Sequence, residues 1–387
     1  MTQISESQRG AMQHFEYEQA WADVFCFDNG TDATEYHAMI HVDSPLLSFQ
    51  QQLAAVLNAY GEVLNHFEGA HAVFKRYFLS DAANQADDII LSDVTDCAKS
   101  VIQQAPLDGT KIALWVYFIT NVNTSITKSG LYEVSHGQYR HLWNGSAHNL
   151  AANSEYQMRL LFNEYVMQLI EEGCKLSDNC IRTWIFVNDI DLNYGGVVNA
   201  RNKVFFTQGL TQNTHFIAST GIGGRQQDPN VLVQMDNYAI GGLQPGQVKH
   251  LYASTHLNRT SDYGVSFERG TTIDYADRRH AIISGTASIN NKGEIMYAKD
   301  VVKQTHRLWE NIGALLAEAE CSYDDVCHMI VYLRDTADYE LVRRLYEERF
   351  PDKPYVIVHA PVCRQGWLIE MECMAVKAVN NPQFAPF

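Results

Sequence analysis

Two stretches of the chain decide its fold because they share one pattern. Residues 157–180 read QMRLLFNEYVMQLIEEGCKLSDNC and residues 304–327 read QTHRLWENIGALLAEAECSYDDVC, so the glutamine and both cysteines recur 147 residues apart (304 − 157). Apolar residues recur at helical spacing in both stretches, as Leu161, Tyr165 and Leu169 do in the first. The chain therefore contains an internal duplication, and each copy opens with a long helix.

The same succession of segments surrounds each of these helices. A turn rich in Ser and Asp leads into an apolar, strand-like run, then an acidic turn, a second helix and a closing strand. A hairpin strand is predicted before each first helix, at 112–120 and 280–289. The other segments lie at 183–187 and 231–240 in the first copy, and at 329–333, 339–350 and 367–376 in the second.

This pattern predicts an α+β fold of two tandem halves, each a mixed sheet backed by two helices. The Gly/Pro-rich segment GGLQPG at 241–246 predicts a connector between them. We expect a first half over residues 1–240 and a second half over residues 247–387. The first hundred residues match the repeat poorly, and we assign them to the first half as additional strands and a helix.

The composition limits the classes of function. The 387 residues carry 29 Lys and Arg against 45 Asp and Glu, a formal net charge of −16, so no nucleic-acid partner is expected. No apolar stretch approaches the roughly 18 residues that span a bilayer, and residues 1–10 are too polar for a signal peptide. We therefore expect a cytoplasmic protein with no membrane partner, whose eight cysteines are reduced.

Motifs for metals and common cofactors are not found. The cysteine pairs Cys174/Cys180 and Cys321/Cys327 are six residues apart, unlike the spacing of zinc knuckles, and core packing explains them better. The glycine-rich GIGG at 221–224 lacks the surroundings of a nucleotide-binding loop, and no serine stands in a nucleophile-elbow frame. We expect neither metal nor cofactor.

Residues 280–378 resemble the YjgF/RidA family, whose fold is chorismate-mutase-like. The resemblance rests on ISG at 283–285, CSYDDV at 321–326, VYLRD at 331–335 and IEME at 369–372. Tyr355 stands at or near the place of the arginine that RidA imine deaminases use to hold a substrate carboxylate. The resemblance thus implies the fold and disfavours imine hydrolysis.

The tandem arrangement and the ending CRQGWLIEME at 363–372 also resemble the chorismatase family. Further matching stretches are YRHLWN at 139–144, ASTGIGG at 218–224, YGVSFERG at 263–270 and SGTASI at 284–289.

The chorismatase resemblance implies a cofactor-independent lyase or hydrolase of secondary metabolism. It implies cleavage of the enolpyruvyl ether of chorismate, releasing pyruvate and a hydroxybenzoate, with 3-hydroxybenzoate favoured, or a dihydroxycyclohexadiene carboxylate. Because the tandem copy can replace a partner subunit, a monomer is feasible.

Glu370 is the candidate catalytic residue. It lies in an otherwise apolar strand next to Trp367, and its counterpart in the first copy is Gln234, so the duplication kept the shape but not the acid. Desolvation raises the pKa of an enclosed carboxyl group, which suits a general acid near neutral pH. A carboxylate that faces solvent or an arginine is the structural alternative. Glu372 points the same way along the strand, and we interpret it as structural.

The substrate is a small carboxylate, which calls for arginine donors. Candidate arginines are Arg140, Arg225, Arg269 and Arg364, although a surface salt bridge is the more frequent role of any single arginine. Tyr139, Tyr194 and Asn144 are candidate hydrogen-bond partners, with packing as the alternative for the tyrosines. The family resemblance adds Gly270 and Cys363, which would control the space and water beside the ring; a turn glycine and a buried, inert thiol are the alternatives.

Two other functions stay open. The first is a RidA-like imine or enamine deaminase that uses the same glutamate. The second is a non-catalytic YjgF-like protein that binds a small ligand, in which Glu370 would be dispensable.

Overall fold

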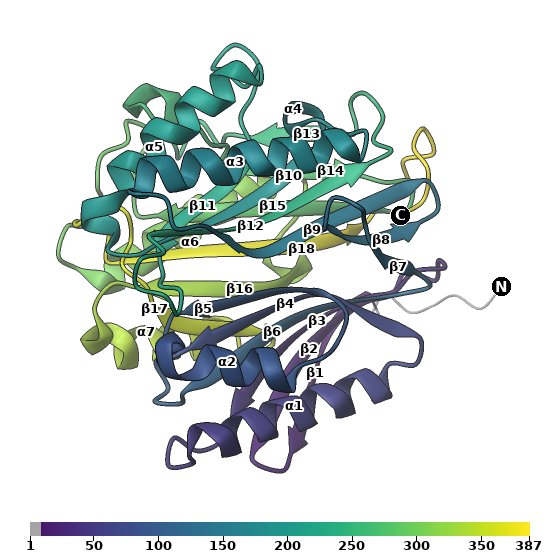
Figure 1. The fold of residues 1–387 in the computed structure, drawn as a ribbon, viewed down its shortest axis with the longest axis vertical. Helices are drawn as coiled ribbons and strands as arrows, with labels where there is room; N and C mark the ends of the chain where they lie inside the picture. Colours follow the sequence, from purple (N-terminus) through teal and green to yellow (C-terminus); the bar gives the residue numbers. More distant parts are fainter. Residues whose placement is uncertain (1–8) are drawn as a thin grey trace.

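A computed structural model describes residues 9–387, apart from the side chains of Arg9 and Tyr263. In these residues the chain forms three six-stranded sheets with helices outside them (Figure 1). Each sheet comes from one stretch of chain, 9–120, 123–241 or 248–378. The predicted α+β fold of tandem YjgF-like units is confirmed, but with three units rather than two. Residues 1–8, part of the segment expected to lack a signal peptide, lie outside the described residues.

Unit 1 is the part of the fold that the sequence did not reveal. The expectation that 112–120 precedes the first helix of the duplicated copy is wrong, because this strand closes the first sheet between β3 and β4. The sheet order is β1-β2-β3-β6-β4-β5, and only the β4–β5 pair is parallel. The elements are β1 (Arg9–Tyr17), β2 (Ala20–Phe27), β3 (Glu35–Val42), α1 (Phe49–His66), β4 (Ala70–Leu79), α2 (Ala82–Ser92), β5 (Ala98–Gln103) and β6 (Ile112–Thr120).

Unit 2 repeats this topology with sheet order β7-β8-β9-β12-β10-β11. Its first helix begins where the Asn153 side chain accepts a hydrogen bond from the Tyr156 amide, which satisfies one free N–H of the first turn. The elements are β7 (Asn123–Ile126), β8 (Tyr132–His136), β9 (Tyr139–His148), α3 (Ser154–Glu171), α4 (Leu176–Asn179), β10 (Cys180–Val187), α5 (Ile190–Thr207), β11 (Ala218–Gly223) and β12 (Val233–Gly241).

Unit 3 has the same order again, β13-β14-β15-β18-β16-β17. The predicted connector at 241–246 joins units 2 and 3, and whether the chain divides there into the two predicted domains stays a prediction. The elements are β13 (Val248–Leu251), β14 (Gly270–Asp274), β15 (Arg278–Ala287), α6 (Val301–Glu318), β16 (Val326–Leu333), α7 (Tyr339–Arg349), β17 (Tyr355–His359) and β18 (Ile369–Ala378), with short 3₁₀ turns at Thr260–Tyr263, Tyr323–Asp325 and Thr336–Asp338.

The three units close into a ring. Strand β5 of unit 1 contacts β9 of unit 2, β11 of unit 2 contacts β15 of unit 3, and β16 of unit 3 contacts β3 of unit 1. The sheets face the centre of the ring, while α1 and α2 cover the outside of one sheet and α3 and α5 the outside of another (Figure 1). The first two interfaces are made by corresponding strands, β5 and β11, whereas at the third β16 rather than the edge strand β17 contacts β3.

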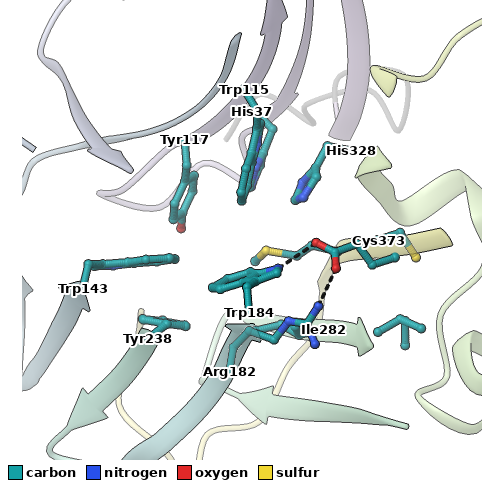
Figure 2. A pocket seen from close by; sticks show the side chains of 13 residues that line it. His37, Trp115, Tyr117, Trp143, Arg182, Trp184, Tyr238, Ile282, His328 and Cys373 are labelled. Carbon is teal, nitrogen blue, oxygen red and sulfur yellow. Dashed lines mark hydrogen bonds and ion pairs between the residues drawn. The ribbon is translucent and has the colours of Figure 1, made fainter. Parts of the chain in front are cut away.

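Buried charges hold the centre of the ring together. Arg76 of unit 1 pairs with Asp236 of unit 2 at 2.8 Å, and Arg182 of unit 2 pairs with Glu372 of unit 3 at 2.8 Å. Figure 2 shows Arg182 and Trp184 pointing at one acceptor, and the Trp184 Nε1–H donates to Glu372 at 2.7 Å. All four charged side chains are almost fully buried, so each needs its partner. Glu372 is accordingly a structural residue.

The chamber beside this network is too small for an organic ligand. Its volume is about 20 Å³, which is room for about one water molecule. His37 and His328 lie in its wall with rings stacked 4.8 Å apart and tilted by 22° (Figure 2), close to the thiol of Cys327. Imidazole lone pairs lie in the ring plane, so stacked rings direct them side by side rather than at one ion. This cluster is part of the packed centre.

None of the helices in residues 9–387 is both long and apolar enough to cross a membrane.

Candidate functional site

A cavity of about 280 Å³ lies at the interface of units 2 and 3. Unit 2 contributes α5 and β11, and unit 3 contributes β15, the start of β18 and the segments that precede β14 and β18. The volume lies near the lower end of the range for small-molecule sites, roughly 300–1,000 Å³. Its lining includes the titratable side chains of Tyr194, Arg201, Arg269, Cys363, Arg364 and Glu370.

Glu370 supplies the acid of this cavity. Strand β18 lies between β15 and β16, and Glu370 stands opposite Ala287 on one neighbour and Tyr332 on the other. The residue is only 4% exposed. Burial raises the pKa of its carboxyl group to about 8, and the negative charge of Glu372 adds to the rise. The carboxyl group therefore keeps its proton at neutral pH.

Two glycines make room for the polar side chains of the cavity. A Cβ atom at Gly285 would collide with Oε1 of Glu370 and would lie 2.9 Å from Cγ2 of Thr220. A Cβ atom at Gly221 would lie 2.9 Å from Cε2 of Tyr194. These close approaches require glycine at both positions.

Arg201 is the cationic residue that the sequence reasoning missed. It is 1% exposed and lines the cavity from α5. Its Nε and Nη2 groups have no hydrogen-bond partner among residues 9–387. A buried guanidinium with free N–H groups is costly unless an anion completes it, so this side chain suits a carboxylate ligand. The signal was available, because Arg201 interrupts the apolar stripe of Val197 and Val204 at helical spacing.

A hydrogen-bonded seam behind the cavity fixes the two units. Nη2 of Arg182 donates to Oγ1 of Thr220 at 2.5 Å, and the same oxygen accepts from the Gly285 amide at 2.8 Å. The Ser219 amide donates to Oγ of Ser284 at 2.9 Å. The seam connects the central charge network to the backbone beneath Glu370, and sequence reasoning did not predict it.

Three further candidates from the sequence share the cavity with Glu370. Arg269 is buried and donates to the backbone and side-chain oxygens of Asn258 at 3.2 and 3.1 Å. Burial raises the pKa of the Cys363 thiol to about 12, so it stays neutral there. Tyr194 lines the cavity from α5. The tertiary structure thus brings together Tyr194, Arg269, Cys363 and Glu370.

The other candidates lie elsewhere. Arg140, on β9, forms ion pairs with Glu133 and Glu172, each at 2.6 Å. The Tyr139 hydroxyl accepts a hydrogen bond from the Gln247 side chain at 2.9 Å.

Asn144 stands opposite Asn237 on the neighbouring strand, and Arg225 lines a separate hollow with Asp189. Gly270 lies in β14, where a Cβ atom would be 3.0 Å from the Ile282 carbonyl oxygen. Contact of these five residues with a substrate stays a prediction to which the cavity lends no support.

The matches to known protein families lie in unit 3. The pattern of the family described as Endoribonuclease L-PSP matches residues 274–377. A RutC family protein of Pyrococcus abyssi is 40% identical over 87 residues, which cover 22% of this chain and 68% of that protein. The chain belongs to the RutC family. Another RutC family member, the 3-aminoacrylate deaminase RutC of Acinetobacter baylyi, is 31% identical over 71 residues, 18% of this chain and 56% of that protein.

The RutC family match covers one unit, whereas a solved structure extends over most of the chain. A crystal structure of a chorismatase superposes with a TM-score of 0.63 at 18% identity, covering 79% of this chain and 93% of that one. At this identity the likeness shows the fold. The resemblance to a chorismatase-type assembly of YjgF-like units is confirmed at that level.

Proposed function

We propose that the cavity between units 2 and 3 cleaves the enolpyruvyl ether of chorismate and releases pyruvate. The observation that carries the proposal is a neutral, buried carboxyl group, that of Glu370, in one cavity with Arg201, whose Nε and Nη2 groups have no hydrogen-bond partner in residues 9–387. The first is an acid that can protonate carbon at neutral pH, and the second is a binding group for a carboxylate. Chorismate offers both an electron-rich methylene carbon and two carboxylates.

The reaction begins with proton transfer from Glu370 to the methylene carbon of the enol ether. The C=C electron pair forms the new C–H bond, and the cation that results is shared with the ether oxygen. Arg201 holds a substrate carboxylate, so the methylene carbon is presented to the acid in one orientation. The glutamate left behind is an anion beside that cation, which stabilises it.

The cation can then be captured in one of two ways, by water or by the neighbouring ring hydroxyl. If water adds, the adduct collapses to pyruvate and a dihydroxycyclohexadiene carboxylate. If the neighbouring ring hydroxyl adds instead, it gives its proton to the glutamate and forms a cyclic ketal. The bond from this oxygen to the ring then breaks, and pyruvate leaves with it as its carbonyl oxygen. The ring keeps the former ether oxygen, loses a proton from carbon and gains one on that oxygen to become a hydroxybenzoate. We favour the second route and 3-hydroxybenzoate, because Phe267, Trp367 and Ile289 give the cavity an apolar lining that disfavours water.

The second candidate function is deamination of an enamine or imine acid. It is favoured by the 3-aminoacrylate deaminase among the relatives. The chemistry is related, since an enamine acid also has an electron-rich carbon to protonate and a carboxylate to bind. Glu370 and Arg201 would serve in the same roles.

The test incubates the purified protein with chorismate, follows pyruvate and identifies ring products by mass. Glu370→Gln keeps the shape and removes the acid, so we expect pyruvate release to fall by about 10²–10⁴-fold. Glu347→Gln, on the exposed surface of α7, is the matched control and should retain full activity. The two ring products differ by one water, so their masses identify the route.

Failure with chorismate leads directly to the second candidate. No pyruvate from the wild type, with ammonia released from 2-imino acids, would establish deamination instead. Release of neither product would leave ligand binding without turnover.

A further inference from the structure

The interface of units 3 and 1 contains a larger groove, of about 510 Å³. Its position in this interface corresponds to that of the Glu370 cavity in the interface of units 2 and 3. One wall is the inward face of β1, β2 and β3, and the other is formed by α7, β17 and the segment between them. The residue of unit 1 that corresponds to Glu370 is Ala113 in β6. Ala113 pairs with Phe78 in β4, as Glu370 pairs with Tyr332 in β16. The groove therefore lacks the acid of the other interface.

Aromatic rings cover the unit 1 wall of the groove. The Trp21 and His41 rings are stacked 4.2 Å apart with planes 17° from parallel, and the His14 ring lies 5.6 Å from Trp21. Tyr339 and Tyr355 line the groove from unit 3. A flat ring inserted between these walls would gain stacking contacts on either side.

The polar groups of the groove contact one another except at one side chain. Asp23 lies 2.7 Å from His14, and Asp108 lies 3.9 Å from His41. Arg343 and Glu347, which also line it, pair with each other.

Lys353 is the exception among the lining residues that the structure describes. It is 6% exposed, and its ammonium group donates to one acceptor, the backbone oxygen of Asp324, at 2.8 Å. The ammonium group also lies 5.5 Å from the centre of the Phe25 ring. It has three donors, so it can donate further hydrogen bonds to a ligand. Burial lowers the pKa of this group, and an anion bound beside it would stabilise its charge.

We propose that this groove is a second ligand site, which binds a small planar aromatic carboxylate without converting it. The ring lies between Trp21 and the tyrosines of unit 3, and the carboxylate completes the hydrogen bonds of Lys353. An aromatic amine is the weaker fit, because Asp23 and Asp108 already face histidines.

The experiment uses benzoate as the probe and the full-length protein. The chain has six tryptophans, so its ¹⁵N-labelled indole groups give a spectrum in which Trp21→Phe identifies the Trp21 signal. Titration with benzoate should shift this signal. Arg201→Met, which disables anion binding in the Glu370 cavity, should leave the shift unchanged, and this separates the second site from the proposed catalytic one.

Two lysine and arginine variants test the charge. Lys353→Met keeps the buried stem and should weaken benzoate binding about tenfold, the loss of one charge-assisted hydrogen bond. Arg343→Gln is the matched control, a paired cation on the same wall, and should change affinity less than about twofold. If Lys353→Met does not fold, Tyr339→Leu on the exposed wall should weaken binding about fivefold.

Several results would overturn the proposal. These are an unmoved Trp21 signal, equal affinity of wild type and Lys353→Met, or loss of the shift in Arg201→Met. Benzylamine binding as tightly as benzoate would overturn the assigned charge. Inorganic phosphate binding as tightly as benzoate would show that the aromatic ring does not contribute to binding.

Discussion

The interface of units 2 and 3 and that of units 1 and 2 differ at two corresponding side chains. In the first, Glu370 occupies the space above Gly285. In the second, the corresponding residues are Gln234 and Ser146, and the Gln234 amide donates to Oγ of Ser146 at 3.3 Å and to the Val101 carbonyl at 3.2 Å. The amide N–H groups of Gln234 bond both units, whereas a carboxyl group above a glycine is left available for chemistry.

The two interfaces also differ in how closely their strands approach each other. At the interface of units 1 and 2, β9 approaches β5 so closely that a Cβ atom at Gly145 would collide with the Lys99 carbonyl. At the interface of units 2 and 3, a cavity remains beside β15. The repeated fold thus supplies three interfaces, and a few side chains decide which of them holds a site.

The largest expected effect lies at the shared centre. Asp236→Ala leaves Arg76 buried without its 2.8 Å partner, and we expect a loss of about 3–5 kcal/mol in the free energy of unfolding, measured by urea denaturation. Arg76→Met combined with Asp236→Leu should recover most of the loss, because no unpaired charge then remains. Equal stability of Asp236→Ala and wild type would show that the network does not hold the ring.

The comparison of interfaces is tested directly by Gly285→Ser. The new Cβ atom displaces the Glu370 carboxyl group, and we expect about a 10²-fold loss of kcat with chorismate, or with an imino acid if that is the substrate. The reciprocal control, Ser146→Gly, removes the hydroxyl oxygen that accepts from the Gln234 amide and from the Val101 backbone amide. Glycine adopts the positive φ of Ser146 more easily, so the loss of stability should stay at about 1 kcal/mol or below, with kcat unchanged. An active Gly285→Ser variant would contradict the assigned role of the glycine.

The two arginines Arg201 and Arg140 separate the cavity from the surface. Arg201→Gln should raise KM by about 10-fold to 100-fold, since a charge-assisted hydrogen bond to the substrate carboxylate is lost. Arg140→Gln should alter KM less than about twofold, because that arginine is bound to Glu133 and Glu172. Steady-state kinetics of both variants decides between the cavity and the sequence-based assignment, and the reverse order of effects would restore Arg140.

The last comparison is the pH dependence set by Glu370. With a pKa of about 8 in the free protein, the acid is protonated at neutral pH, so kcat/KM should fall about tenfold per pH unit above 8. The folded state binds this proton more tightly than the unfolded state, whose carboxyl pKa is near 4.5. The group's contribution to stability is therefore complete below pH 4.5 and is lost as pH rises to 8.

Glu370→Gln measures that contribution. Relative to wild type, the variant should gain stability as pH rises through this window, as followed by thermal unfolding at pH 5, 7 and 9. A difference that does not change with pH would mean that Glu370 has an ordinary pKa.

Sequence reasoning identified units 2 and 3 because their first helices and following strands keep recognisable residues in register. Unit 1 keeps the same order of elements with different residues, and many apolar sequences satisfy one buried strand or helix face. Its charged residues Lys75 and Arg76 inside the apolar strand β4 were the available sign of a buried network. Without knowledge of neighbouring units they resemble surface charges.

For the site, the sequence was informative where the difference between copies was chemical. Glu370 against Gln234 stood out because one is an acid in an apolar strand. Arg201 lies in α5, which contacts unit 3 only because the three units close into a ring. Nothing in the local sequence therefore distinguishes it from the arginines on the surface.

By itself the sequence determined the α+β unit, its repetition and the single acid, because helical and strand periodicity and a lone carboxyl group are local properties of the chain. Only the tertiary structure decided that the units number three, that they close into a ring, and that Arg201, Gly285 and Glu370 meet at one interface. The reason is that burial, which raises the pKa of Glu370 and leaves Arg201 in need of an anion, depends on contacts between segments far apart in the chain.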